Sequence, residues 1–232
     1  TSSGSYNQAE EIVITANTTE SVQSGNTITV TLDTSDTVLL TAASTGTTLV
    51  GTYTVGSGDT SAGLTVNSFA IGTVADTAGN AMTSTTLPVA GSIFGSKTIT
   101  IDTAAPTVNA IETTAFSWGS VLNATEDNSD GTVSVTTSGA EDGQTLTITL
   151  NGATYTNTVS SNSVTVTISA AGLQALTNGS SYTLTADVSD TAGNAATQVT
   201  SSSFSVETTA PTISEVLLAA DNSTLTVTMS EA

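Results

Sequence analysis

Apolar and polar residues alternate in short runs along most of the chain, which is the pattern of half-buried β-strands. The clearest run is residues 145–150, which read Thr-Leu-Thr-Ile-Thr-Leu with a strict period of two. Asn151 and Gly152 follow it, and both tolerate the positive φ of a two-residue hairpin turn. Similar alternation fills residues 27–33 and 163–168. We therefore predict an all-β protein.

Two short motifs recur and divide the chain into repeats. Residues 102–106 (Asp-Thr-Ala-Ala-Pro) return as residues 207–211 (Glu-Thr-Thr-Ala-Pro), and Asp-Thr-Ala-Gly-Asn occurs at 76–80 and again at 190–194. Each Asp-Thr-Ala-Gly-Asn turn precedes an acidic linker that contains Ala-Pro. Two matched markers at domain-sized spacing indicate a tandem array.

The spacing of the strands favours immunoglobulin-like β-sandwiches, since seven or eight short strands fall within about 100 residues. We predict that residues 1–102 form one such repeat that lacks a full leading strand. Residues 103–209 form a second, which opens on a strand at 108–114, and residues 210–232 supply the first strands of a third. Short linkers that contain Pro leave little slack, so we expect a rod-like array.

Composition restricts the partners of the chain. Its 232 residues carry 20 acidic side chains against one basic side chain, Lys97, for a formal net charge of −19. Internal ion pairs cannot neutralise this charge, and phosphate groups need Lys and Arg. We therefore expect no nucleic acid partner. We also expect no membrane insertion, because the sequence contains no long apolar run. Metal cations are the natural partners.

The absence of His and Cys excludes most catalytic chemistry. Catalytic triads, thiolate nucleophiles and His-bearing zinc sites all need one of these residues. A glycosidase with two carboxylates remains formally possible. Aromatic residues make up only 4% of the chain, however, and the acidic motifs recur at equivalent positions. We therefore predict that the protein is not an enzyme.

A carbohydrate-binding module is the alternative from a different functional class, because β-sandwiches often bind sugars. Such a module needs planar aromatic side chains on an exposed face. Trp118 and Phe116 are the one candidate pair in the sequence. The competing interpretation, which we favour, is that this pair packs in the core or at a domain junction.

Several motifs together resemble the immunoglobulin-like repeats of large secreted bacterial adhesins, including the calcium-dependent, type I secreted adhesins of biofilms. They are the Asp-Thr-Ala-Gly-Asn turns, the acidic linkers, and residues 121–127 (Val-Leu-Asn-Ala-Thr-Glu-Asp). Residues 217–227 are similar to the start of a repeat found in cyanobacterial surface proteins linked to swimming motility. The resemblance implies an extracellular or cell-surface extender that holds a distant binding domain away from the cell.

Acidic residues from distant positions are expected to meet beside the linkers and to bind calcium. In an immunoglobulin-like sandwich, Asp102 lies at the same end as Glu141, Asp142 and Asp190, whereas the loop after the first strand lies near the outgoing linker. A hard cation with six to eight oxygen ligands removes the repulsion among such carboxylates. The candidate ligands are Asp102, Asp190, Asp142, Glu141, Asp76, Glu207, Glu126 and Asp127.

Asp76 and Asp190 have a second interpretation, which is that each caps its own turn through bonds to backbone amides. Capping and calcium binding are compatible, so both stay open. Asn80 or Asn194 could complete a calcium shell. Glu207 stands where the first linker has Asp, and its longer arm changes the geometry of the second junction.

The two ends of the sequence are complementary, because the first repeat lacks a leading strand and residues 210–232 supply strands without a sandwich. One explanation is that the ends of the sequence are out of phase with the domains. The other is that copies join head to tail, with residues 212–218 of one chain pairing with the open edge of the next chain's first repeat. Such a contact would propagate as a filament.

Overall fold

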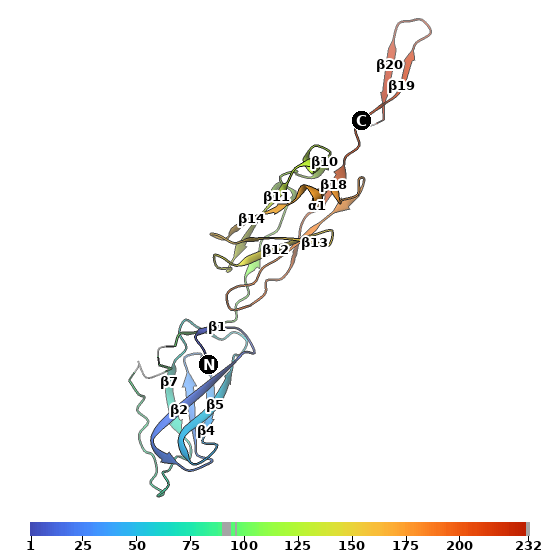
Figure 1. Ribbon diagram of the computed structural model, residues 1–232. Helices are drawn as coiled ribbons and strands as arrows, with labels where there is room; N and C mark the ends of the chain where they lie inside the picture. The colour runs from blue at the N-terminus through green and yellow to red at the C-terminus, as the bar shows by residue number, and fades with distance from the viewer. Residues whose placement is uncertain (90–93, 96, 231–232) are drawn as a thin grey trace. The chain divides into compact units, whose positions relative to one another are not determined.

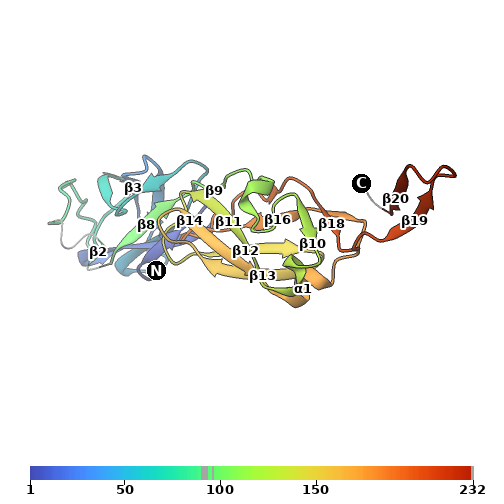
Figure 2. The same ribbon diagram turned by 90° about the horizontal axis from the view of Figure 1, so that it is seen from above.

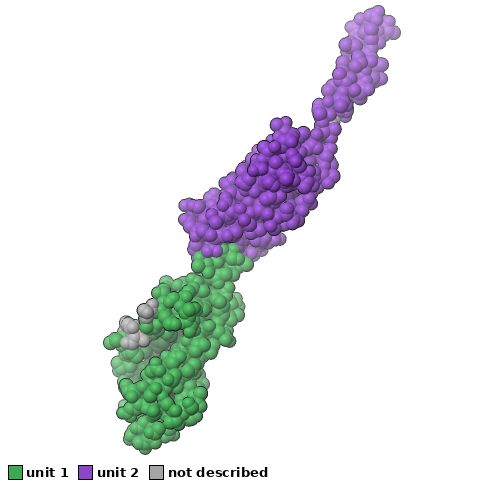
Figure 3. Space-filling view, in the orientation of Figure 1, with its two compact units in different colours: residues 1–105, 189–195 green, residues 106–188, 196–232 purple. Residues whose placement is uncertain are grey.

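The computed structural model describes residues 1–89, 94–95 and 97–230 (Figure 1). Within these ranges the chain is nearly all β-structure, and its one α-helix is α1 (Ala170–Gln174). None of the described helical segments has the length and apolar character that crossing a membrane needs. The contacts divide the chain into unit 1, residues 1–105 with 189–195, and unit 2, residues 106–188 with 196–232 (Figure 3).

Unit 2 is built from short strands that alternate buried and exposed side chains. They are β9 (Thr107–Val108), β10 (Val121–Asn123), β11 (Gly131–Ser138), β12 (Thr145–Leu150), β13 (Ala153–Thr158), β14 (Ser163–Ile168), β15 (Ser181–Tyr182), β16 (Leu184–Asp187), β17 (Val199–Thr200) and β18 (Phe204–Glu207). The sheet orders are β14-β11-β9, β13-β12-β16-β17 and β10-β18-β15. Several of these strands, among them β12 and β13, are labelled in Figure 2. The predicted all-β immunoglobulin-like class is confirmed.

The hairpin of β12 and β13 follows the sequence pattern closely. Leu146 and Ile148 point inward and are fully buried. Asn151 and Gly152 form the turn with φ of 48° and 81°, as the Asn-Gly pair predicted. This conformation is open to Asn and Gly because their steric penalty at positive φ is small.

An aromatic cluster closes the core of unit 2. Trp118 stacks on Phe116 with ring centroids 5.2 Å apart, and Phe204 meets the face of Trp118 at 5.3 Å. Trp118 and Phe116 are each only 4% exposed. The pair that a carbohydrate-binding module would need therefore lies inside the protein and presents no platform to a sugar.

The opening strand predicted at residues 108–114 is wrong beyond its start, because β9 ends at Val108 and the 3₁₀ turn η2 spans Thr113–Ala115. β9 pairs with β11, whereas β10 pairs with β18 in another sheet. The chain must leave one sheet and enter the other between these strands. Ile111 lies on this connecting segment and is only 2% exposed, so its apolar side chain packs in the core although the segment is not a strand.

The described residues of unit 1 form eight strands: β1 (Gly4–Tyr6), β2 (Glu11–Val22), β3 (Thr27–Leu32), β4 (Thr37–Thr41), β5 (Gly46–Thr54), β6 (Thr60–Ser61), β7 (Val66–Ile71) and β8 (Ile99–Asp102). Five form one sheet in the order β2-β5-β4-β3-β7, and three form a second in the order β1-β8-β6. Ile12, Leu32, Leu40 and Leu49 are fully buried in the core. β1 pairs with β8 in the three-stranded sheet. β2 is the outermost strand of the five-stranded sheet, beside β5.

The last two strands, β19 (Ile213–Leu218) and β20 (Leu225–Met229), form an antiparallel hairpin. Every residue of both strands is exposed. The predicted assignment of residues 210–232 to a third repeat stays a prediction, as do the other domain boundaries.

Gly131 leaves no room for a side chain beside Trp118, and we expect Gly131→Ala to destabilise unit 2. A Cβ at this position would lie 2.6 Å from Trp118 Cζ3 and 3.0 Å from Leu173 Cδ1. Overpacking of this kind costs about 1–3 kcal/mol. Denaturant unfolding followed by the fluorescence of Trp118, the sole Trp of the chain, would measure the loss.

The matched control is Gly46→Ala, since a Cβ at Gly46 meets no atom within 4 Å. We expect its effect to stay within about 0.5 kcal/mol. An unchanged free energy of unfolding for unit 2 in Gly131→Ala would contradict the tight packing.

Candidate metal centres beside the linkers

In unit 2 the parallel pairing of β10 with β18 places the acidic linker residue, Glu207, beside the loop after β10. β10 and β18 run in the same direction, and Asn123 lies opposite Glu207 at their carboxyl ends. Glu126 folds back, and its Oε2 accepts the backbone N–H of Asn123 at 3.1 Å. Glu207 Oε1 accepts the N–H of Thr209 at 2.7 Å. Both glutamates are thereby held at the start of the linker.

Glu126 and Glu207 line one cavity of about 400 Å³ at this end of unit 2. Asp127 follows in the 3₁₀ turn η3 (Glu126–Asn128) but does not line the cavity. The donors are carboxylate, amide and backbone carbonyl oxygens, which is the set that suits Ca²⁺. The lining residues are Asn123, Ala124, Thr125, Glu126, Glu207, Thr208, Thr209 and Ala210.

Unit 1 repeats this arrangement with residues that the sequence analysis missed. Glu10 Oε2 accepts the backbone N–H of Asn7 at 2.7 Å, just as Glu126 does for Asn123. β1 and β8 are parallel, and Asn7 and Asp102 come directly after their last pair. The detectable signal is the repeat of Asn-x-x-Glu followed by a second acidic residue, in residues 7–11 and 123–127.

The linker acids make the same local bond in both units. Asp102 Oδ1 accepts the N–H of Ala104 at 2.9 Å, two residues further on, as Glu207 does from Thr209. The longer glutamate arm therefore reaches the equivalent amide. This bond orders the linker and leaves further lone pairs on each carboxylate.

The two Asp-Thr-Ala-Gly-Asn turns are capped in the same way, so the capping interpretation is confirmed. Asp76 Oδ1 accepts the N–H of Asn80 at 2.8 Å, and its Oδ2 accepts Asn80 Nδ2 at 2.7 Å. Asp190 makes both bonds with Asn194, at 2.8 and 2.9 Å. The hydrogen bond from the Asn80 side chain is the main cause that lowers the pKa of Asp76 below its usual range.

The second turn is built into the linker region of unit 1. Asn194 Nδ2 donates to the carbonyl oxygen of Asp102 at 2.9 Å. A Cβ on Gly193 would lie 3.2 Å from Asn7 Nδ2, so the turn also packs against Asn7. Asp190 is only 4% exposed. Asp102, Asp190 and the Asn7–Glu10 loop thus belong to one region, residues 1–105 with 189–195.

Glu141 and Asp142 lie in a loop of unit 2. Asp142 Oδ1 accepts the N–H of Ser161 at 2.6 Å. Their expected meeting with Asp102 and Asp190 stays a prediction. Across the part of the chain that the structure describes, no three acidic side chains are grouped closely enough to hold a metal ion. A calcium site here needs amide and backbone oxygens beside its carboxylates.

A further contact fixes the first linker. Thr103 Oγ1 donates to the carbonyl oxygen of Asp59 at 3.0 Å. The Asp59 carboxylate accepts Tyr53 Oη and Gly56 N–H, each at 2.6 Å. Burial, with this hydrogen bond, raises the pKa of Tyr53 above its usual value, so the phenol stays a donor. Thr103 of the linker is therefore bonded to the Asp59 loop, and that loop is in turn bonded to Tyr53, a buried residue of the core.

Comparisons with solved structures found similarity to bacterial adhesins. A structure of a Ca²⁺-stabilised adhesin that helps an Antarctic bacterium reach out and bind ice is 28% identical over 94% of this chain, with a TM-score of 0.49. A structure of a 1.5-MDa bacterial ice-binding adhesin is 26% identical over 88%, with a TM-score of 0.43. An immunoglobulin-like domain of the M. primoryensis ice-binding adhesin is 33% identical over 45% of this chain and 96% of the domain, with a TM-score of 0.31.

The chain spans 50% and 61% of the first two structures. No protein-family model and no curated protein matched. The chain is thus similar in sequence, at 26–33% identity, to segments of bacterial adhesins, which is the resemblance that the motifs predicted.

The Asp76 turn yields a test of the capping geometry. We expect Asn80→Ala to raise the pKa of Asp76 toward its ordinary value, because the variant removes the main cause of the depression. A carboxyl NMR titration in calcium-free buffer would measure it. The folded-state pKa is depressed, so the stabilising bond is present above the unfolded pKa and is lost as pH falls through the folded value.

Asp221 is an internal control for this titration, because Ser223 lowers its pKa independently. Its titration should not change in Asn80→Ala. An Asp76 pKa that stays the same in the variant would show that the side-chain bond does not form in solution.

Proposed function

We propose that this chain is a non-enzymatic extender segment of a bacterial cell-surface adhesin, in which calcium stiffens the regions beside the linkers. The similarity to segments of bacterial adhesins supports this role. So does the duplication of the linker chemistry, since a scaffold repeats its parts whereas an enzyme needs one assembled active site. The fold itself carries no function, so the argument rests on the sites.

The linkers support extension because each is bound to its own unit. Thr103 is held by the Asp59 carbonyl and the Asp102 carbonyl by Asn194. At the second linker, Asn178 Oδ1 accepts the N–H of Thr208 at 2.9 Å. Pro106 and Pro211 then fix φ and restrict the residue before them. We expect these bonds and prolines to leave each linker little torsional freedom.

The shared cavity of Glu126 and Glu207 is the observation that carries the calcium assignment. The two side chains are negative, they come from sequence positions 81 residues apart, and both line one space of about 400 Å³. Like charges held together in this way repel each other unless a cation joins them. Asp102 with Asn7, Glu10 and the Asp190 turn forms the corresponding region of unit 1.

We expect calcium to bind both regions and to raise the melting temperature. Ligand that binds only the folded state stabilises it by about 2.7 kcal/mol at 100 times the dissociation constant. Calorimetric titration should show one ion fewer in Glu126→Gln/Glu207→Gln, and one fewer in Glu10→Gln/Asp102→Asn. Trp118 fluorescence should report the change in unit 2.

Glu20→Gln/Glu215→Gln removes the same charge from two exposed positions and is the matched control. It should bind calcium as the parent chain does. Equal melting temperatures with calcium and with chelator would refute the calcium assignment and leave the extender role to be judged by shape.

The predicted rod arrangement is tested by small-angle scattering. The parent chain in calcium should give an elongated profile with a well-defined maximum dimension. A variant with about ten Gly and Ser residues inserted after Ala105 should give a broader distribution, because such linkers behave as flexible coils. A compact profile for the parent chain would contradict the extender role.

A further inference from the structure

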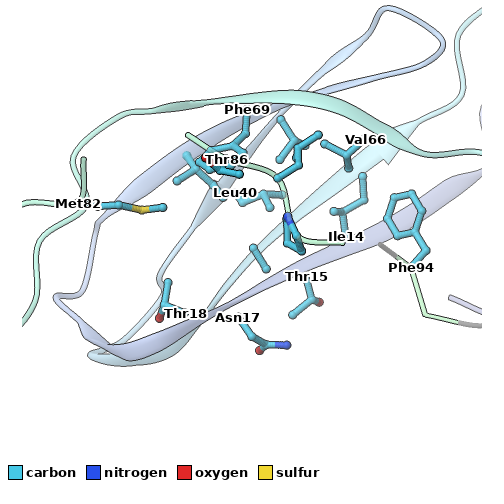
Figure 4. A pocket seen from close by; sticks show the side chains of 15 residues that line it. Ile14, Thr15, Asn17, Thr18, Leu40, Val66, Phe69, Met82, Thr86 and Phe94 are labelled. Carbon is cyan, nitrogen blue, oxygen red and sulfur yellow. The ribbon is translucent and has the colours of Figure 1, made fainter. Parts of the chain in front are cut away.

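Two Asn-Gly pairs occur in the sequence, Asn151-Gly152 and Asn178-Gly179, and both lie in exposed turns of unit 2. An asparagine before glycine is chemically labile, because the backbone nitrogen of the glycine can attack the Cγ atom of the asparagine side chain. Glycine has no Cβ to obstruct this approach. Asn17, at the wall of a cavity in unit 1, is followed by Thr18, whose branched side chain crowds the same approach (Figure 4). The two Asn-Gly pairs are therefore the candidates for spontaneous modification.

The backbone of the Asn178 turn is held by the body of unit 2. The N–H of Gly179 donates to the carbonyl oxygen of Val206 in β18 at 2.9 Å. On the other side of Asn178, Tyr182 Oη accepts the N–H of Thr177 at 2.9 Å. The nitrogen that would attack Asn178 is thus engaged as a hydrogen-bond donor.

The side chain of Asn178 is held by the second linker. Its Oδ1 accepts the N–H of Thr208 at 2.9 Å, and its Nδ2 donates to Thr209 Oγ1 at 2.7 Å. Cyclisation requires the Asn178 Cγ atom to reach the Gly179 nitrogen, and the two bonds to the linker hold the side chain against that rotation. A group that is held in this way reacts through local opening of its bonds.

Asn151 offers a comparison within the same unit. It lies at the tip of the β12–β13 hairpin, where Asn151 and Gly152 are both exposed. In the part of the chain that the structure describes, the Asn151 side chain forms no hydrogen bond. The two pairs therefore share their chemistry and differ in whether the linker holds the asparagine.

We propose that Asn178-Gly179 is a site of spontaneous deamidation that the second linker protects, so that release of the linker opens the site to modification. The Gly179 nitrogen loses its proton to water and attacks Cγ of Asn178. A new C–N bond closes a succinimide ring, the bond from Cγ to Nδ2 breaks, and ammonia leaves with a proton from water. Water then opens the ring at one of its two carbonyl carbons and yields aspartate or isoaspartate. The reaction consumes water and releases ammonia.

Either product changes the contact between the turn and the linker. The donor to Thr209 is lost with the ammonia, and a carboxylate takes the place of the amide beside Thr208 and Thr209. Isoaspartate also routes the backbone through the side chain, which moves Gly179 away from its partner Val206. Because the ammonia is lost to solvent, the modification marks every chain whose second linker has been released. This inference goes beyond the extender role and does not depend on calcium.

Thr209→Val tests the protection, because it removes the Oγ1 atom that accepts from Asn178 and keeps the backbone N–H. Thr208→Val is the matched control, since Thr208 binds Asn178 through its backbone N–H, which valine retains. Each chain is incubated in mildly alkaline, calcium-free buffer, and peptide mass spectrometry after pepsin digestion follows both Asn-Gly pairs. We expect conversion at Asn178 to be about fivefold faster in Thr209→Val, the factor that corresponds to the net free energy of one hydrogen bond. Conversion at Asn151 should be the same in the parent and both variants.

The parent chain unfolded in guanidinium chloride gives the rate at each pair without protection. Folding should slow conversion at Asn178 more than conversion at Asn151. This comparison needs no variant, so it decides the matter even if Thr209→Val does not fold. Equal rates at Asn178 in the folded and the unfolded parent overturn the proposal. So do equal rates in the folded parent and a folded Thr209→Val, or an Asn178 that stays unmodified in the unfolded chain.

Discussion

Backbone amides hold the carboxylates of this chain, because one lysine cannot pair with 20 acidic side chains. Asp76 and Asp190 accept amides in their own turns, and Asp102 and Glu207 accept amides in their linkers. Bonds from an amide to a carboxylate are stronger than bonds between neutral groups. Each of these four acidic side chains therefore orders a turn or a linker and keeps its negative charge. The carboxylates that order the turns and linkers are therefore the same groups that would bind cations.

Two parallel strand pairs, β1–β8 and β10–β18, bring this charge to the linkers. In an antiparallel pair, the end of one strand meets the start of the other. In the parallel pairs β1–β8 and β10–β18, the residues after both strands meet at one edge. The Asn-x-x-Glu loop and the linker acid are thus neighbours in both units. The chemistry is duplicated because the fold is duplicated, which suits a repeated mechanical part better than a single catalytic centre.

The sequence predicted elements whose packing is local and failed where long-range packing decides. Strict alternation located β12 and β14, and Asn151-Gly152 located the hairpin turn between β12 and β13. Residues 108–114 look like a strand because Ile111 is apolar, yet that side chain is buried during a crossing between sheets. The Asn7–Glu10 loop was missed because its residues between Asn and Glu differ from those of its counterpart. The Asp190 turn contacts Asp102 through Asn194 and lies against Asn7 at Gly193, and no local pattern records these long-range contacts.

The edge strand β2 is not protected by charged side chains along its middle. Proteins commonly block exposed strand edges with lysines. Here the one lysine, Lys97, donates to the carbonyl oxygen of Thr1, and the edge residues Thr15 and Asn17 are uncharged. Chains of charge −19 repel one another. Salt screens the repulsion between exposed charges that lie more than about 8–10 Å apart at 0.10–0.15 M ionic strength. Each bound calcium ion would also cancel two negative charges, so the carboxylates that order the linkers would weaken this repulsion when they bind calcium.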